Sequence, residues 1–122
     1  MGLDTTHGCW CGAYSSFASF RKDLARQIGI SNLNSMVGFG GNIPWTPYIN
    51  HDLYPLLNHS DCDGEISPSD AGLIIRGLDA ILADVDINKL FEYDVVDFVH
   101  LVKRFRDGAQ LAFESNEEIS FH

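Results

Sequence analysis

One short segment, from His59 to Asp70, constrains the fold more than any other part of the sequence. It reads HSDCDGEISPSD and lies between two apolar runs. Its glycine permits a sharp bend, and the isoleucine that follows is typical of a short strand. Residues 67–70 then predict a helix start, because serine caps free amides, proline suits the first helical position and an acid suits the helix dipole. Turn, strand and helix start therefore follow one another directly.

The spacing of this segment matches an EF-hand loop, in which alternate side chains converge on one cation and a glycine at the sixth position permits the bend. Gly64 takes that sixth position. The predicted metal ligands are His59, Asp61, Asp63, Glu65 and Asp70. EF-hand loops usually work in pairs, and the sequence has no second one.

Two of these residues depart from the usual EF-hand pattern. His59 stands where aspartate is usual, and Asp70 stands where a bidentate glutamate is usual. Both changes weaken calcium binding and favour other ions, because calcium prefers oxygen ligands. We therefore expect either a divalent cation (calcium, magnesium or manganese) or no metal, with the aspartates accepting backbone amides in a turn.

The rest of the chain has mostly helical periodicity. Apolar residues recur at helical spacing in three long stretches, and a fourth, short stretch precedes the loop. The predicted helices cover about 14–28, 51–57, 67–83 and 92–113, with a long loop over 30–50. Val95 is expected on the buried face of the last helix, and Gly108 is expected to interrupt or kink that helix.

We predict a single domain over residues 1–122 that is mainly α, of the α+β class. It has three to four helices, the EF-hand-like loop and a small β-ribbon formed by the loop strand and a chain terminus. The loop strand covers 64–66, and its expected partner is either 119–121 or 3–6.

Charge and cysteine content narrow the class of function. The 122 residues carry a formal net charge of −9, which disfavours direct binding to nucleic-acid phosphates or anionic membranes. No apolar run approaches the roughly 20 residues of a membrane span. Because the three cysteines are an odd number and no apolar leader precedes the domain, we expect a reducing, cytoplasmic setting.

Aromatic and polar side chains are concentrated near the N-terminus. The candidate ligand- or partner-binding residues there are His7, Trp10, Tyr14 and Arg21. Their rings could form a stacking platform for a flat anionic ligand. Alternatively, Trp10 belongs to the core and the polar residues cap the first helix. Zinc binding by the Cys-x-Cys pair is less favoured, because that spacing is poor for zinc and a fourth ligand is not local.

The sequence DCDG at 61–64 also matches the nucleophile motif of an aspartyl phosphatase. That motif ends a buried apolar strand in a doubly wound sheet, and no such strand or βαβ repeat is present. This assignment is therefore excluded. No complete catalytic constellation is visible, so no catalytic residue is predicted.

Four stretches together resemble a family of small uncharacterised proteins of bacteria and their phages. They are GLDTTH at 2–7, WCGAYSSF at 10–17, HSDCDGEI at 59–66 and EEISFH at 117–122. The resemblance implies a cytoplasmic protein of bacterial or phage origin. It implies no established activity.

These features together predict a non-enzymatic binding or regulatory module whose partner is a protein or a small ligand. Two alternatives stay open. The first is a phage-encoded inhibitor of a host defence enzyme, acting through an acidic surface or by sequestering a nucleotide, which would need a cationic pocket. The second is a small divalent-metal-dependent hydrolase with its ion at the histidine and aspartates of the loop.

Overall fold

The computed structural model of the chain describes residues 2–60 and 63–122. It is mainly helical with two short antiparallel ribbons, so the predicted α+β class is confirmed. The helices are α1 (Tyr14–Gln27), α2 (Tyr54–Leu57), α3 (Pro68–Ala83) and α4 (Val95–Glu114). The strands are β1 (Gly2–Asp4), β2 (Cys11–Ala13), β3 (Glu65–Ile66) and β4 (Ile119–Ser120).

Short 3-10 turns complete the described part of the chain, at Thr6–Gly8, Leu33–Ser35, Thr46–Tyr48 and Ile87–Lys89. Two of them lie in the segment predicted to be a long loop. Within the described residues, no helix has the length and apolar character needed to cross a membrane.

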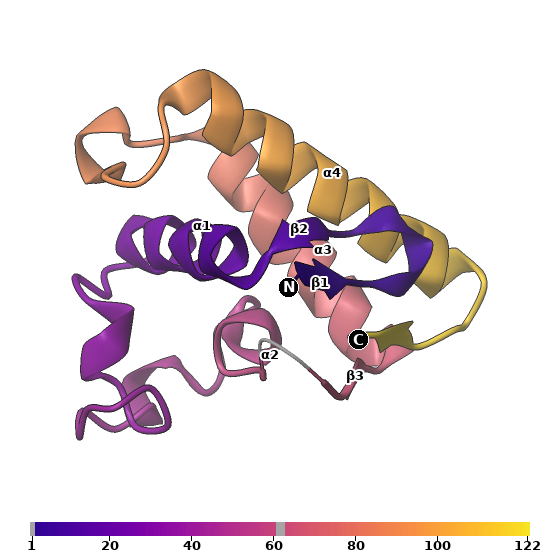
Figure 1. Ribbon diagram of the computed structural model, residues 1–122, viewed down its shortest axis with the longest axis horizontal. Coiled ribbons are helices and arrows are strands. Elements are labelled where there is room, and N and C mark those ends of the chain that lie inside the picture. Colours follow the sequence, from indigo (N-terminus) through magenta and orange to yellow (C-terminus); the bar gives the residue numbers. More distant parts are fainter. Residues whose placement is uncertain (1, 61–62) are drawn as a thin grey trace.

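The core lies between the three long helices. α3 packs along α4, and α1 lies against this pair (Figure 1). Phe20 of α1 sits 6.3 Å from both Phe98 and Phe105 of α4, measured between ring centroids. Each such aromatic contributes roughly 1.5–3 kcal/mol on burial. The expectation for Val95 is wrong: it is 41% exposed, because the buried face of α4 begins at Phe98.

The predicted β-ribbon is formed. β3 pairs with the C-terminal strand β4, joining Glu65 to Ser120 and Ile66 to Ile119. The C-terminal segment is also tied to the N-terminal one. Thr5 forms an isolated bridge with Phe121, and the amides of Asp4 and His122 each donate to the other residue's carbonyl at 2.9 Å. Residues 119–122 therefore have a backbone partner on either side.

β1 and β2 form a hairpin, which the sequence did not predict. The turn between them passes through His7 and Gly8, at φ values of 63° and 73°. The Thr5 hydroxyl secures the base of the turn by accepting the Trp10 amide at 2.9 Å. The strands are too short to show the alternation that identifies a hairpin in sequence.

α4 begins at Val95, three residues after the predicted start. Asp94 caps it, with a carboxylate oxygen accepting the Asp97 amide at 2.8 Å. The amides of residues 91–93 donate instead to the carboxylate of Asp23 on α1. The segment that leads into α4 is therefore held on α1, ahead of the Asp94 cap.

α4 runs through Gly108 without a break, so the predicted interruption does not form. The glycine makes room for the hairpin turn instead. A Cβ at position 108 would lie 2.6 Å from the Cys9 sulfur and 2.9 Å from its Cα and amide nitrogen. The backbone of the hairpin turn at Cys9 is therefore in direct contact with α4.

The burial of Cys9 predicts its chemical reactivity. Burial raises the pKa of its thiol to about 12, whereas Cys11 is exposed on β2. At about pH 8 we expect iodoacetamide to alkylate Cys9 on the order of a thousandfold more slowly in the folded protein than in urea. The reason is that the thiolate is the reactive form, and burial disfavours it. Peptide mass mapping would measure both residues. Alkylation of Cys9 as fast as that of Cys11 would contradict the packing against Gly108.

Candidate functional site

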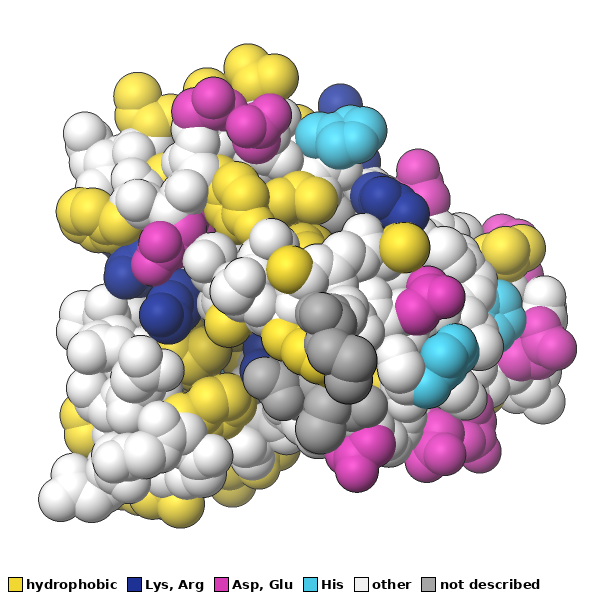
Figure 2. Space-filling model, in the orientation of Figure 1, with side chains coloured by type: hydrophobic (Ala, Val, Ile, Leu, Met, Phe, Trp, Pro, Cys, Tyr) yellow, Lys and Arg dark blue, Asp and Glu magenta, His cyan; other side chains and the backbone are white. Residues whose placement is uncertain are grey.

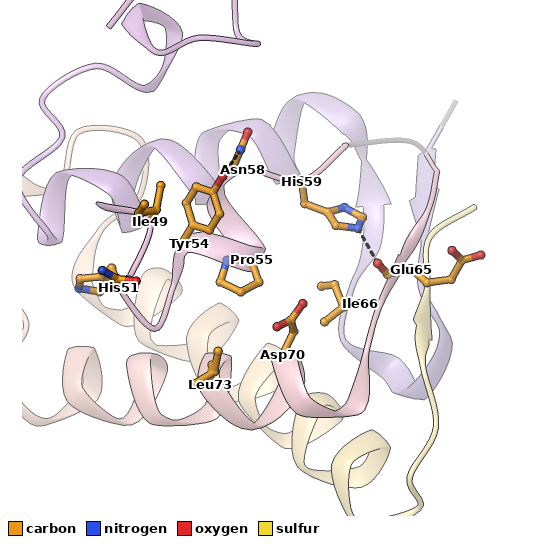
Figure 3. Close-up of a pocket in the computed structure, with 11 residues that line it drawn as sticks. Ile49, His51, Tyr54, Pro55, Asn58, His59, Glu65, Ile66, Asp70 and Leu73 are labelled. Carbon is orange, nitrogen blue, oxygen red and sulfur yellow. Dashed lines mark hydrogen bonds between the residues drawn. The ribbon is translucent and has the colours of Figure 1, made fainter. Parts of the chain in front are cut away.

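The predicted loop borders a cavity of about 470 Å³, here called the loop cavity (Figure 3). Its walls come from α2, the segment after it, β3 and the first turns of α3. Apolar lining comes from Ile49, Pro55, Ile66 and Leu73. Polar lining comes from Asn50, His51, Tyr54, Asn58, His59, Glu65 and Asp70. Apolar walls with a few polar groups are typical of small-molecule sites.

The ring of His59 lies between two backbone carbonyls of the predicted loop. Its Nδ1 lies 2.8 Å from the carbonyl oxygen of Ser60, and its Nε2 lies 3.1 Å from that of Glu65 (Figure 3). The ring also packs against Phe121, with centroids 4.3 Å apart. Gly64 bends the chain beside it at a φ of 88°, a region that favours glycine. Each nitrogen through which the ring could bind a metal therefore faces a backbone carbonyl.

Asp70 points its carboxylate into the loop cavity, whereas the Glu65 carboxylate points away from it (Figure 3). Asp70 is the third residue of α3, and its amide donates to the hydroxyl of the capping Ser67 at 3.1 Å. Its carboxylate makes no hydrogen bond or ion pair within the described part of the chain. A negative charge thus faces the cavity.

The opposite wall retains hydrogen-bonding capacity. Asn58 donates its side-chain amide to the Tyr54 hydroxyl at 3.0 Å, which leaves the hydroxyl proton and the Asn58 carbonyl oxygen for a ligand. His51 accepts the Leu53 amide at Nδ1, also at 3.0 Å, which leaves its Nε2.

The predicted metal ligands are not gathered among the described residues. Asp61 lies outside those residues, and Asp63 is exposed. Across 2–60 and 63–122, no three His, Cys, Asp or Glu side chains lie close enough to hold one ion. The described part of the loop has the element order expected of an EF-hand: a short helix, a glycine bend, a strand and an exit helix.

The four residues of the predicted N-terminal set do not form one surface. Trp10 is 4% exposed and packs against Phe17 and Phe20, so its ring belongs to the core and is not an accessible stacking platform. Tyr14 packs half-buried against the core. His7 contacts Glu117, with Nε2 3.0 Å from a carboxylate oxygen.

Arg21 has a role that the sequence did not reveal. It is 3% exposed, and its guanidinium lies over the rings of Phe17 and Phe39 at 4.8 and 5.2 Å. Its Nη1 donates to the backbone carbonyls of Leu57 and His59. Arg21 therefore positions the segment that forms one wall of the loop cavity.

A second cavity, also about 470 Å³, lies on the other side of that wall and is here called the α1 cavity. Asn58 and His59 line both cavities. The α1 cavity is otherwise bounded by Ser60, by residues 18, 21 and 22 of α1, and by residues 33, 34, 38 and 39 of the long loop. Within the described residues, no acidic side chain lines it.

The two cavities have opposite electrostatic character. The loop cavity presents a carboxylate, and the α1 cavity presents a lysine and an arginine. Both are large enough for a small molecule. Comparison of the chain with protein-family models, with curated proteins and with solved structures finds no match in any of the three.

Proposed function

We propose that the chain is a non-enzymatic binding module that holds a small cationic ligand in the loop cavity. Asp70 is the charged recognition group, and Tyr54 and Asn58 supply further hydrogen bonds. The observation that carries the proposal is the Asp70 carboxylate, which faces the cavity without a partner in the described part of the chain. Beside apolar walls, such a charge attracts a cation more strongly than it would in open water.

A binding role is better supported than a catalytic one, because the side chains best suited to catalysis already contact the backbone. His59 and Arg21 both contact backbone carbonyls around the loop. Their side chains maintain the shape of the cavity wall. A wall that is ordered before binding lowers the entropic cost of holding a ligand.

An acidic face for a basic partner has less support. Figure 2 shows Asp and Glu side chains in several separate groups, with hydrophobic and basic side chains between them. The net charge of −9 still enriches cations near the surface. The free thiols of Cys9 and Cys11 suit a reducing compartment, in keeping with a bacterial or phage cytoplasmic setting.

A calorimetric titration tests the proposal. Hydrated divalent ions (calcium, magnesium, manganese, zinc) and an organic diamine such as putrescine share the required positive charge. We expect one of the two classes to bind saturably, and Asp70→Asn to weaken that binding by about tenfold or more, the loss expected when a charged contact is removed. Asp63→Asn is the matched control, because Asp63 is exposed and does not line the cavity.

The outcomes separate the possibilities. If both Asp70→Asn and Asp63→Asn lose metal binding, the metal is held by an EF-hand-like loop and not by the cavity site. Diamine binding lost only in Asp70→Asn would make the ligand an organic ammonium compound. Saturable binding that persists in Asp70→Asn, or no heat with any cation, would overturn the proposal. Thermal unfolding of each variant should confirm that it folds, since an acid at the start of a helix contributes about 0.3–1 kcal/mol.

A further inference from the structure

We propose that the α1 cavity binds the phosphate group of a small ligand. This site is separate from the loop cavity and has the opposite charge. Its described lining contains Arg21 and Lys22 and no acid, in a chain with 17 acidic residues and 8 lysines and arginines. Figure 2 shows basic side chains over α1, next to the loop that follows it.

Lys22 supplies the mobile positive charge of the cavity. Its side chain is half-buried and forms no ion pair with any residue of the described ranges. The guanidinium of Arg21 is fixed nearby between two aromatic rings. A lysine that is free to approach, beside an arginine that is held in place, favours a compact anion over a second protein surface.

The loop after α1 adds backbone donors. Gly38 lines the cavity at a φ of 91°, and its amide makes no hydrogen bond within the described chain. The loop is held in this shape by the Val37 amide, which donates to the Ile43 carbonyl at 3.0 Å. Free amides of a glycine-containing turn, together with a lysine, are a recurrent means of binding phosphate oxygens.

Two other residues that line the α1 cavity could contact the organic part of a phosphorylated molecule. The side chain of Asn34 has no partner in the described part of the chain and can donate or accept a hydrogen bond. The ring of Phe39 lies at the cavity and contacts Trp45, with centroids 6.0 Å apart. An aromatic ring and a carboxamide can stack on and hydrogen-bond to a nucleobase. Inorganic phosphate and a nucleoside monophosphate therefore share the chemistry that the cavity recognises.

Calorimetry with three probes tests the inference: inorganic phosphate, adenosine monophosphate and adenosine. We expect at least one phosphate compound to bind saturably and adenosine not to bind. Lys22→Gln should weaken the binding by about tenfold, as expected for a lost charge-assisted contact. Lys89→Gln is the matched control, since it makes the same change in net charge at an exposed position outside the cavity. It should bind within about twofold of the unmodified protein, because Lys89 does not line the cavity and salt screens exposed charges.

The probes also distinguish the two sources. Binding of inorganic phosphate and the nucleotide with equal affinity assigns the site to phosphate alone. Tighter nucleotide binding that is reduced by Phe39→Leu assigns it to a nucleotide. Wild-type affinity in Lys22→Gln, equal losses in both lysine variants, or binding of adenosine as tight as that of its monophosphate would overturn the inference. Asp70→Asn should bind the phosphate compound unchanged, which separates this test from that of the loop cavity.

Discussion

Replacing Asp23 with alanine is expected to lower the free energy of unfolding by about 4 kcal/mol, because a buried acceptor of several amides is lost. Asp23 is fully buried on α1. Its two carboxylate oxygens accept the amides of Phe91, Glu92 and Tyr93 at 3.0–3.3 Å. Alanine would leave all three amides without this acceptor, and it would release the segment that leads into α4.

Urea denaturation measures this effect, with Asp94→Ala as the matched control. Asp94 accepts one amide, that of Asp97, at the exposed start of α4. Its loss should cost about 1 kcal/mol, the usual value for a helix cap. Arg26→Ala removes the ion pair with Asp23, in which the two atoms lie 3.0 Å apart, and leaves the amide contacts in place. Its cost therefore measures the share of the Asp23→Ala loss that comes from the ion pair. A cost for Asp23→Ala no larger than that for Asp94→Ala would show that the buried contacts contribute little.

The second large effect is expected for Gly108→Ala, which should destabilise the protein by about 2–3 kcal/mol through overpacking. The new methyl group would meet the backbone of Cys9 at 2.9 Å, and the backbone cannot rotate away as a side chain could. This loss opposes the gain of roughly 1 kcal/mol that alanine gives over glycine inside a helix. The overpacking loss exceeds this gain, so the net change is a loss of about 1–2 kcal/mol as long as the hairpin stays in place.

Gly72→Ala is the control for helix propensity. Position 72 lies inside α3, and its nearest neighbour is the ring of Phe113 at 3.0 Å. That ring is 48% exposed and can move, so the substitution should be neutral or stabilising. Thermal denaturation of both variants gives the comparison. Equal stabilities for the two variants would mean that the hairpin turn shifts easily away from α4.

Local signals made much of the fold predictable. Ser67 and Pro68 fixed the start of α3 to the residue, because cap chemistry depends on neighbours in sequence. The pairing of the loop strand with a chain terminus was also predicted, since an unpartnered strand needs a neighbour, and 119–121 was one of the two candidate segments. The position of Gly108 was misread because a glycine in a helical pattern looks the same whether it bends the helix or admits another backbone.

The candidate site was less predictable, because its polar groups act across long sequence separations. His59 was expected to bind a metal, yet its ring contacts the carbonyl of Glu65 and packs against the ring of Phe121. Arg21 lies 38 residues from the His59 carbonyl that it contacts. Asp70 was predicted from the sequence as a metal ligand, because the cap motif places it at the helix start. The α1 cavity could not be found, since its walls meet only after α1 and residues 33–39 pack together.

The pairing of residues 119–122 with both the N-terminal segment and the loop strand also sets an order of events during synthesis. A ribosome makes β1 and the loop strand long before the segment that joins them. Neither strand can gain this neighbour until His122 has left the exit tunnel, and contacts between such distant residues form slowly. Until then, His59 lacks the ring of Phe121 beside it. The segment around His59 should therefore take its final shape only after those residues emerge, however early the helices form.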